Sequence, residues 1–564
     1  MSVTSPLLLA LQLVVAGPPP ALPPDSLLAR AIAYIDAAAR EHLGRERTPG
    51  LSLAVVASGE VVAIRSYGVA DLASGAPVTP DTRFLVGSIS KAFTAVALLQ
   101  LEEEGLVDLQ RPVTTYLPWF RVRSAGGPIT LHHLLTHSAG LPRDRSDLPS
   151  SPYTALALRD RELTGTPGER FAYSNIGYQL LSLIVEEVEG RPFATAIQSR
   201  ILSPLGLRAT RPEVTQEDRL RTATGYQYLF DDRPPLPGTP VVPVAWSEYS
   251  AGDANIVSTA PDLARFLIAL LEQGGAPGRR LLQPRSFARM VQRTVPAEDL
   301  GAGSYYGYGM VLTTIEGDPA LWHSGGMPGF RSMLIGDLDE QVGVIVLLNG
   351  PGEPRLLGEY ALRALIAARR GREPPPVPVA APPDSIPGAA AFAGRYADST
   401  GRELSLASRG DRLFLELDGH RVPLYRAGRD AFVVADTGWS RFPLRAVREG
   451  DRVVELVHGP RWFRAPGPPA PASPVAPSVW RAYAGHYRAQ VPFDSNYRVI
   501  VRRGVLLLVS PEGIEEPLLP VGDGAFRVGR DPRAPERVRF ADIVSGRALR
   551  LNLSGTEYYR ATSP

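Results

Sequence analysis

Apolar residues recur at helical spacing in several segments before residue 370. This spacing predicts helices over residues 90–104, 176–190 and 262–274. Two largely apolar segments, residues 51–57 and 343–349, are bounded by glycine and proline and predict strands. Another helical pattern follows the second run at once, over residues 353–368. These elements predict a mixed domain of helices and strands, with a sheet built from both ends of the domain.

The C-terminal part shows a different pattern, in which apolar and polar residues alternate over short segments. Residues 413–417 and 497–501 are examples, and Gly/Asp turns separate such segments. The sequence Phe-Ala-Gly-Arg-Tyr at 392–396 recurs as Tyr-Ala-Gly-His-Tyr at 483–487, an offset of about ninety residues that is typical of a duplicated unit. Short alternating strands in two such units predict two small antiparallel β-barrels.

Two proline-rich stretches divide the chain, because runs of proline form neither helix nor sheet interior and favour extended spacers. The total length of 564 residues also indicates several domains, since one domain rarely exceeds about 250 residues. The predicted organisation is a possible signal peptide over 1–25, a large domain over 26–370, a linker over 371–387, a first barrel over 388–464, a second linker over 465–478 and a second barrel over 479–564.

The N-terminal residues resemble a signal peptide. An apolar run of about ten residues is followed by small residues and prolines, although no Lys or Arg precedes Arg30. The pattern predicts a periplasmic or secreted protein, and the alternative is an apolar arm on a cytoplasmic one. No other stretch reaches the ~20 apolar residues of a membrane helix, so no integral membrane span is expected.

The composition excludes several classes of function. Hydrophobic residues make up 44% of the chain and charged residues 21%, which is the balance of a globular protein. The 60 Lys and Arg nearly cancel the 58 Asp and Glu, so no overall field indicates nucleic acid or an anionic membrane as a partner. Because cysteine is absent, disulfides, thiol catalysis and cysteine-ligated metals are excluded.

Lys91 is the only lysine among the 60 basic residues, and all the others are arginine. A guanidinium stays protonated and cannot act as a base, whereas a buried amine can. Lys91 follows Ser88 by three residues, so both side chains share one face of the first turn of a helix. A serine hydroxyl becomes an effective nucleophile when a nearby base takes its proton. Ser88 and Lys91 are therefore the predicted nucleophile and base.

Tyr173-Ser-Asn175 is a second candidate element, between Phe171 and the predicted helix that starts near residue 176. A phenol can relay a proton to a leaving group, and an amide can hold Lys91 and a substrate carbonyl without a titratable charge. The competing interpretation is that the tyrosine and the asparagine only cap the helix.

His323-Ser324-Gly325-Gly326 is the third candidate element and precedes a strand-like stretch. Its small residues let a substrate backbone approach the strand edge, where an N–H can face an oxyanion. The histidine either donates to a substrate carboxylate or packs. Arg331, just beyond, either contacts a substrate carboxylate or pairs with a neighbouring acid.

In this order, Ser-x-x-Lys, Tyr-x-Asn and His-x-Gly resemble the three active-site motifs of the serine β-lactamase, penicillin-binding-protein and D-aminopeptidase superfamily. Flanking sequence, such as Pro167-Gly-Glu-Arg-Phe171, extends the resemblance over roughly residues 30–365. The resemblance implies an α+β fold. Its β-lactamase/transpeptidase-like catalytic domain would have a helical subdomain and an antiparallel sheet flanked by helices, and two lipocalin-like antiparallel barrels would follow.

The resemblance also implies a role for each site residue. Ser88 would be acylated, Lys91 would be the base, Tyr173 would relay a proton and Asn175 would position the reacting groups. The triplet residues His323, Ser324 and Gly325 would bind substrate together with Gly326. The oxyanion hole would use the backbone N–H groups of Ser88 and Gly326, and no cofactor would be required.

One departure from the superfamily affects the expected substrate. Class C β-lactamases have Lys-Thr-Gly where this chain has His323-Ser-Gly325, and histidine lacks the permanent charge that meets a β-lactam carboxylate. Efficient β-lactamase activity is therefore not expected. The His-x-Gly form and the two barrels resemble D-aminopeptidases, which favours a D-aminopeptidase or DD-peptidase-like enzyme. The alternatives are a promiscuous carboxylesterase, a penicillin-binding sensor whose acyl-enzyme persists, and a scaffold whose barrels bind partners.

The remaining candidates have competing structural explanations. His132, His133 and His137 include a pair at i, i+4, but no glutamate lies between them as in zinc proteases, so no metal is expected. Asp253 and Asn255 are expected in a loop beside the active site, with a structural role. A barrel loop that entered the cleft would set specificity. The resemblance implies a small-molecule or peptide substrate with an amide or ester bond.

Overall fold

The computed structural model describes residues 26–124, 126–144, 147–159, 161–163, 165–276, 279–379, 381–467, 474–491, 494–522 and 524–562. The possible signal peptide lies outside the described residues. Among the helices of the described ranges, none is both long enough and apolar enough to cross a membrane.

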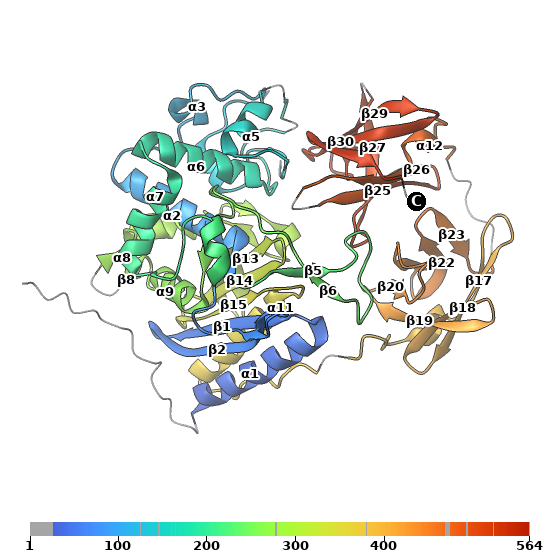
Figure 1. The fold of residues 1–564 in the computed structure, drawn as a ribbon, viewed down its shortest axis with the longest axis horizontal. Helices are drawn as coiled ribbons and strands as arrows, with labels where there is room; N and C mark the ends of the chain where they lie inside the picture. The colour runs from blue at the N-terminus through green and yellow to red at the C-terminus, as the bar shows by residue number, and fades with distance from the viewer. Residues whose placement is uncertain are drawn as a thin grey trace, which may run out of the picture.

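A nine-stranded antiparallel sheet forms the centre of the large domain (Figure 1). Its strands, in order across the sheet, are β10 (Val295–Pro296), β11 (Tyr305–Tyr306), β12 (Val311–Ile315), β13 (Asp318–Met327), β14 (Phe330–Asp337), β15 (Val342–Leu348), β1 (Gly50–Ala57), β2 (Glu60–Asp71) and β3 (Ala76–Pro77). β1 pairs with β15, with Leu51 opposite Leu348. The prediction that the sheet combines both ends of the domain is confirmed.

Helices cover both faces of this sheet. Successive side chains of a strand point to opposite faces, so Leu53 and Val55 of β1 pack with α1 (Leu27–Glu46) and α11 (Pro354–Arg369). Ala54 and Val56 pack in the other core with α9 (Ala260–Leu271). Because β1 is buried on both faces, its sequence is a continuous apolar run without alternation.

The other helices form a helical part beside the sheet. They are α2 (Ser90–Glu103), α3 (Val113–Tyr116), α4 (Leu131–Leu135), α5 (Ser151–Ala157), α6 (Asn175–Glu189), α7 (Phe193–Ile197), α8 (Ser203–Leu205) and α10 (Pro284–Met290). Short 3-10 or π turns are η1 (Gly87–Ile89), η2 (Gln198–Leu202), η3 (Gln216–Arg221) and η4 (Glu298–Leu300). The predicted helices correspond to α2, α6, α9 and α11 and are confirmed. α6 ends where predicted, because Gly190 adopts a left-handed conformation with φ of 63°.

Three two-stranded sheets complete the large domain. They pair β4 (Phe84–Leu85) with β7 (Val257–Ser258), β5 (Tyr226–Tyr228) with β6 (Val241–Pro243), and β8 (Gly275–Ala276) with β9 (Arg279–Arg280). The first of these holds the chain just before η1 against the loop that precedes α9. The β5–β6 hairpin projects from the domain towards the C-terminal barrels (Figure 1).

Two closed eight-stranded antiparallel barrels follow, as predicted. The first contains β16 (Gly394–Ala397), β17 (Glu403–Arg409), β18 (Arg412–Leu417), β19 (His420–Arg426), β20 (Ala431–Val434), β21 (Leu444–Glu449), β22 (Arg452–His458) and β23 (Arg461–Arg464), after the turn η5 (Ala389–Phe392). The second contains β24 (Gly485–Arg488), β25 (Asn496–Arg502), β26 (Val505–Val509), β27 (Glu515–Gly522), β28 (Ala525–Val528), β29 (Arg537–Val544), β30 (Arg547–Leu553) and β31 (Thr556–Arg560), after α12 (Trp480–Tyr483).

The repeated sequence motif has the same structural role in both barrels. The Tyr396 hydroxyl donates to the Phe392 carbonyl at 2.8 Å, and the Tyr487 hydroxyl donates to the Tyr483 carbonyl at 2.7 Å. Each tyrosine is buried in the core of its barrel. The motif therefore fastens the segment that enters each barrel to the first strand of that barrel.

Candidate active site

Ser88 and Lys91 meet at the start of α2. Ser88 lies in the turn η1, and Lys91 is fully buried one turn later. The Lys91 Nζ donates to the Ser88 Oγ at 2.9 Å. The sequence expectation that these two side chains share one face of the helix start agrees with this geometry, which places the amine directly beside the hydroxyl.

The Lys91 amine has three hydrogen-bond acceptors. Besides Ser88, it donates to the Asn175 Oδ1 at 2.8 Å and to the Asp253 backbone carbonyl at 3.0 Å. A lysine amine offers three protons only as the ammonium ion, so this arrangement stabilises the charged form. To act as a base, Lys91 must first give up one of these protons.

Asn175 is the first residue of α6, and Ser174 caps that helix by accepting from the Gly177 N–H at 3.2 Å. The capping role is thus taken by Ser174 and leaves the Asn175 amide free to bind Lys91. The Asn175 Nδ2 donates to the Asp144 carboxylate at 3.2 Å, which fixes which end of the amide faces Lys91.

The Tyr173 ring packs between two cations and an aromatic cluster. Lys91 Nζ lies 4.9 Å and the Arg143 guanidinium 5.4 Å from the centre of the ring. On the remaining side the ring contacts His137, with 4.2 Å between ring centres. Tyr173 therefore lies beside Lys91 and lines the same cavity as Ser88.

His323 has both ring nitrogens occupied within the protein. Its Nδ1 lies 2.7 Å from the Ser324 carbonyl, which can only accept, so Nδ1 carries the proton. Its Nε2 then accepts from the Tyr306 hydroxyl at 2.9 Å. Burial, together with the charge of Lys91, lowers the pKa of His323 to about 3. Of the two roles open from sequence, this geometry favours packing over donation to a substrate.

Close backbone approaches bring the other triplet residues to η1. A Cβ on Gly325 would lie 1.9 Å from the Val86 carbonyl, and a Cβ on Gly87 would lie 2.6 Å from the Gly326 nitrogen. Only glycine fits at either position. Gly326 therefore lies directly against the turn that carries Ser88, where two backbone N–H groups can face one oxygen atom.

The strand edge beside Ser88 is open to the cavity. Within the described residues, β13 pairs with β14 up to Met327, whereas β12 pairs with β13 only up to Trp322. Residues 323–327 therefore extend beyond β12, and His323, Ser324, Gly326 and Met327 line the cavity next to Ser88.

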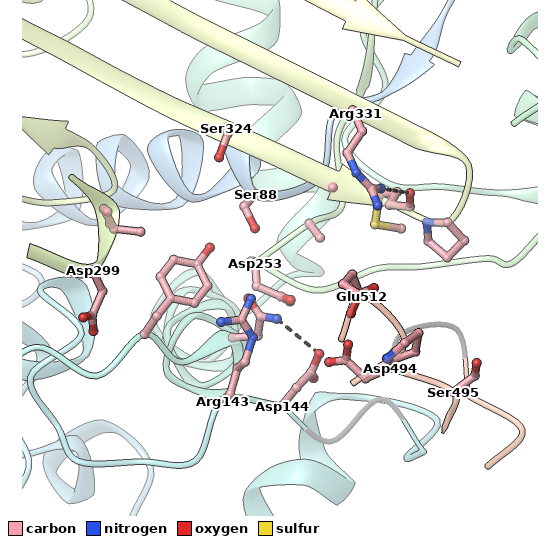
Figure 2. Close-up of a pocket in the computed structure, with 18 of the residues that line it drawn as sticks. Ser88, Arg143, Asp144, Asp253, Asp299, Ser324, Arg331, Asp494, Ser495 and Glu512 are labelled. Carbon is pink, nitrogen blue, oxygen red and sulfur yellow. Dashed lines mark hydrogen bonds between the residues drawn. The ribbon is translucent and has the colours of Figure 1, made fainter. Parts of the chain in front are cut away.

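This cavity has a volume of about 1190 Å³ and is walled by two domains. Figure 2 shows Ser88, Ser324 and Asp253 of the large domain facing Asp494, Ser495 and Glu512 of the second barrel. Nine carboxylate residues and five arginines line it among the described residues. The cavity is therefore electronegative, and its second-barrel wall, which includes Asp494, Glu512 and Glu536, is named the acidic roof below.

Polar contacts fix the second barrel over the cavity. Asp531 pairs with Arg170, and Arg533 pairs with Glu169 at 2.9 Å. The Arg143 backbone N–H donates to Glu536 at 2.7 Å. On the opposite side, residues of the β5–β6 hairpin make further ion pairs with the barrel, which are Asp231 with Arg488 and Asp232 with Arg498, each at 2.7 Å.

Residues 35–368 match the protein family described as Beta-lactamase. The chain belongs to the β-lactamase family. It is 27% identical to penicillin-binding protein 4* of Bacillus subtilis (strain 168) over 423 residues, which cover 70% of this chain and 89% of that protein. It is 31% identical to esterase EstB of Burkholderia gladioli over 336 residues, covering 52% of this chain and 81% of EstB. The solved structure of the octameric penicillin-binding protein homologue from Pyrococcus abyssi is similar, with a TM-score of 0.56 and 26% identity, and the match covers 77% of this chain and 99% of that one.

Membership of the β-lactamase family makes this chain a serine hydrolase at the general level. The three histidines considered from the sequence as a possible metal site make hydrogen bonds within the protein. His132 Nδ1 bonds to the Tyr308 hydroxyl at 2.8 Å, and His133 Nδ1 accepts from the Thr130 N–H at 3.2 Å in a helix cap. His137 Nδ1 accepts from the Ser174 N–H at 3.1 Å. These ring nitrogens point to different partners and do not converge on one point.

Arg331 lies at the cavity wall, as Figure 2 shows, but its guanidinium donates to the backbone carbonyls of Met327 and Phe330. Asn255 Nδ2 donates to the Pro212 carbonyl, a structural role as expected. The sequence predicts only that a barrel loop entering the cleft would set specificity, and it does not identify the residues of the acidic roof. Its members come from another domain, and no motif links them to Ser88.

Proposed function

We propose that this chain hydrolyses amide bonds through an acyl-enzyme, as a D-aminopeptidase-like or DD-peptidase-like peptidase of small substrates that carry a positive charge. Ser88 attacks the carbonyl carbon while its proton passes to Lys91. The proton then reaches the leaving amine with the help of Tyr173, and water releases the acyl group. The 2.9 Å contact between Lys91 and Ser88 supports the first step.

The single observation that carries the choice of substrate is the acidic roof. Asp494, Glu512 and Glu536 line the cavity opposite the open edge of β13. Burial raises the pKa of Asp494, and Arg143 opposes this shift. A substrate ammonium group in the cavity would stabilise these carboxylates, whereas a neutral or anionic group would not.

His323 supports a peptidase over a β-lactamase. Its pKa of about 3 keeps it neutral, so it supplies no charge for a β-lactam carboxylate. The likeness to esterase EstB supports a carboxylesterase as the second candidate. Action in the periplasm or outside the cell remains a prediction from the N-terminal sequence.

The test compares four substrates on the full chain and on Ser88→Ala. They are D- and L-alanine p-nitroanilide with a free amine, N-acetyl-D-alanine p-nitroanilide and p-nitrophenyl acetate, and intact mass spectrometry follows the acyl-enzyme. We expect a transient adduct on Ser88, and kcat/KM at least about tenfold higher for the free amine than for its N-acetyl form, which corresponds to about 1.4 kcal/mol.

Asp494→Asn should reduce this preference for a free amine, while Asp542→Asn on the outer surface of the second barrel should not change it. Turnover of the ester alone would favour the esterase, and an adduct that forms but does not clear would favour a penicillin-binding sensor. Absence of any adduct or product would reject the catalytic proposal.

A further inference from the structure

The carboxyl group of Asp253 is buried beside Lys91, and no cation of the described residues makes an ion pair with it. Asp253 has 3% of its surface exposed. Its Oδ1 and Oδ2 accept from the Tyr249 hydroxyl at 2.9 and 3.1 Å, and the Gln179 amide donates to that hydroxyl at 3.1 Å. A single phenol proton is therefore shared by both oxygens of a buried carboxyl group, while the Asp253 carbonyl accepts from Lys91.

The loop that carries Asp253 cannot move away from Lys91. On α2, Thr94 donates to the Gly252 carbonyl at 2.6 Å, and Ser90 accepts from the Ile256 N–H at 3.0 Å. A Cβ on Gly252 would lie 2.9 Å from the Tyr178 carbonyl of α6. The loop is thus clamped between two helices, and these contacts hold the Asp253 backbone carbonyl beside Lys91.

Other charged and titratable groups face this pair from every neighbouring element. They are Tyr178 and Tyr173 at α6, His137 and Arg143 in the loops after α4, Asp144 beside Asn175, Tyr249 before β7, and His323 on β13. His137 and His323 are neutral, because burial lowers the pKa of each. The Asp253 carboxyl group interacts electrostatically with both Lys91 and the Asp144 carboxyl group.

We propose that Asp253 is a positioning residue whose buried carboxylate stabilises the ammonium form of Lys91 and so controls how readily Lys91 takes the Ser88 proton. This rests on the proposed function, in which Lys91 takes the Ser88 proton. The negative charge of the Asp253 carboxylate favours the ammonium form of Lys91, which donates three hydrogen bonds. Protonation of the Asp253 carboxylate removes this stabilisation.

The electrostatics of Asp253 agree with such a role. Burial raises the pKa of Asp253 to about 7, and the charge of Lys91 acts in the opposite direction. Its carboxyl group therefore changes charge near neutral pH.

The test is the pH profile of Ser88 acylation by p-nitrophenyl acetate, measured as the burst rate of the full chain. Asp253→Asn keeps the hydrogen-bond acceptor for Tyr249 but removes the negative charge. The acidic limb of the pH profile, where the burst rate falls as the pH is lowered, should therefore move to lower pH by about one unit. Tyr249→Phe, which disfavours the carboxylate, should move it in the same direction by less. The matched control is Asp337→Asn, another buried acid whose pKa is raised, to about 6, at the far end of β14.

An acidic limb that stays in place in a folded Asp253→Asn protein, while Ser88 is still acylated, would overturn the role of Asp253 alone. If Asp253→Asn does not fold, an acidic limb of the pH profile that stays in place in Tyr249→Phe would overturn the role of Asp253 instead. By contrast, a burst that persists in Ser88→Ala would overturn the proposed function itself. An equal shift in Asp337→Asn would show a general effect of buried charge and would also overturn the assignment.

Discussion

Gly87 lies so close to Gly326 that a Cβ on Gly87 would stand 2.6 Å from both the nitrogen and the oxygen of Gly326. Gly87 also has a φ of 53°, in the left-handed region that favours glycine. The turn before Ser88 and the strand edge at Gly326 are thus held in direct backbone contact. The two N–H groups proposed for the oxyanion hole depend on this contact.

Gly87→Ala should therefore separate the two N–H groups and lower kcat/KM by about 10²-fold or more, the usual cost of losing an oxyanion donor. Gly75→Ala is the control, because Gly75 has a φ of 70° but no atom within 4 Å of its Cβ position. Steady-state kinetics on both variants checks the prediction. Equal losses would mean that backbone strain, and not the contact with Gly326, is responsible.

Lys91→Arg should abolish acylation although the positive charge is kept. A guanidinium cannot release a proton at ordinary pH, and loss of a general base usually lowers the rate by about 10² to 10⁴-fold. Ser88→Ala should lose the covalent adduct, whereas Ser74→Ala, at an exposed serine between β2 and β3, should retain it. Intact mass spectrometry after exposure to an acylating probe measures all three. An adduct on Lys91→Arg at the normal rate would contradict the assignment of the base.

His323 should make folding stability depend on pH. An unfolded histidine titrates near 6.5, and the pKa of folded His323 is about 3. Between these values the unfolded chain binds more protons, so the stability from neutral His323 is complete above about pH 6.5 and is lost as the pH falls towards 3.

His323→Gln should accordingly reduce the loss of stability in acid, by at most about 1.4 kcal/mol per pH unit across that window. Thermal melting of both proteins near pH 7 and near pH 4 provides the comparison. His420→Gln, at an exposed histidine of the first barrel, should leave the pH dependence unchanged. A similar change in both variants would show that burial of His323 is not the cause.

The position of the second barrel should respond to salt. Asp531 pairs with Arg170 at the cavity wall, and exposed ion pairs are screened at high ionic strength. Asp531→Asn is expected to raise KM a few-fold, which corresponds to a loss of roughly 0.5–1 kcal/mol of binding free energy, and to change kcat less. It should also reduce the sensitivity of KM to salt. Asp430→Asn breaks a similar pair with Arg448 inside the first barrel and should change neither value. A salt effect of unchanged size in Asp531→Asn would disprove this coupling.

Much of the fold followed from local sequence. The apolar runs of β1 and β15 and the helices α2 and α6 were predicted because burial and helical spacing act on consecutive residues. Ser88 and Lys91 were found for the same reason, since one helical turn sets their separation. The barrels followed from alternation and from an internal repeat.

The contacts between distant segments were not predictable in this way. Nothing in the sequence indicates that Tyr306 donates to His323 or that Asp144 orients Asn175, because these pairs depend on tertiary packing alone. Asp494 and Glu512 reach the cavity only because the second barrel is seated on the large domain. The roles of Asp253 and Arg331 likewise depended on which backbone groups lie beside them.

The tyrosine bond at the entrance of each barrel has a consequence for how such a chain can change over evolutionary time. Tyr396 and Tyr487 close the same short loop in two copies, and each copy fills its interior with its own side chains. The two barrels therefore share the same contact at their entrance but have separate cores. The loops at the rim of one barrel can then change to suit a new substrate while the other barrel stays unchanged. New substrate selectivity can thus arise without altering the chemistry at Ser88.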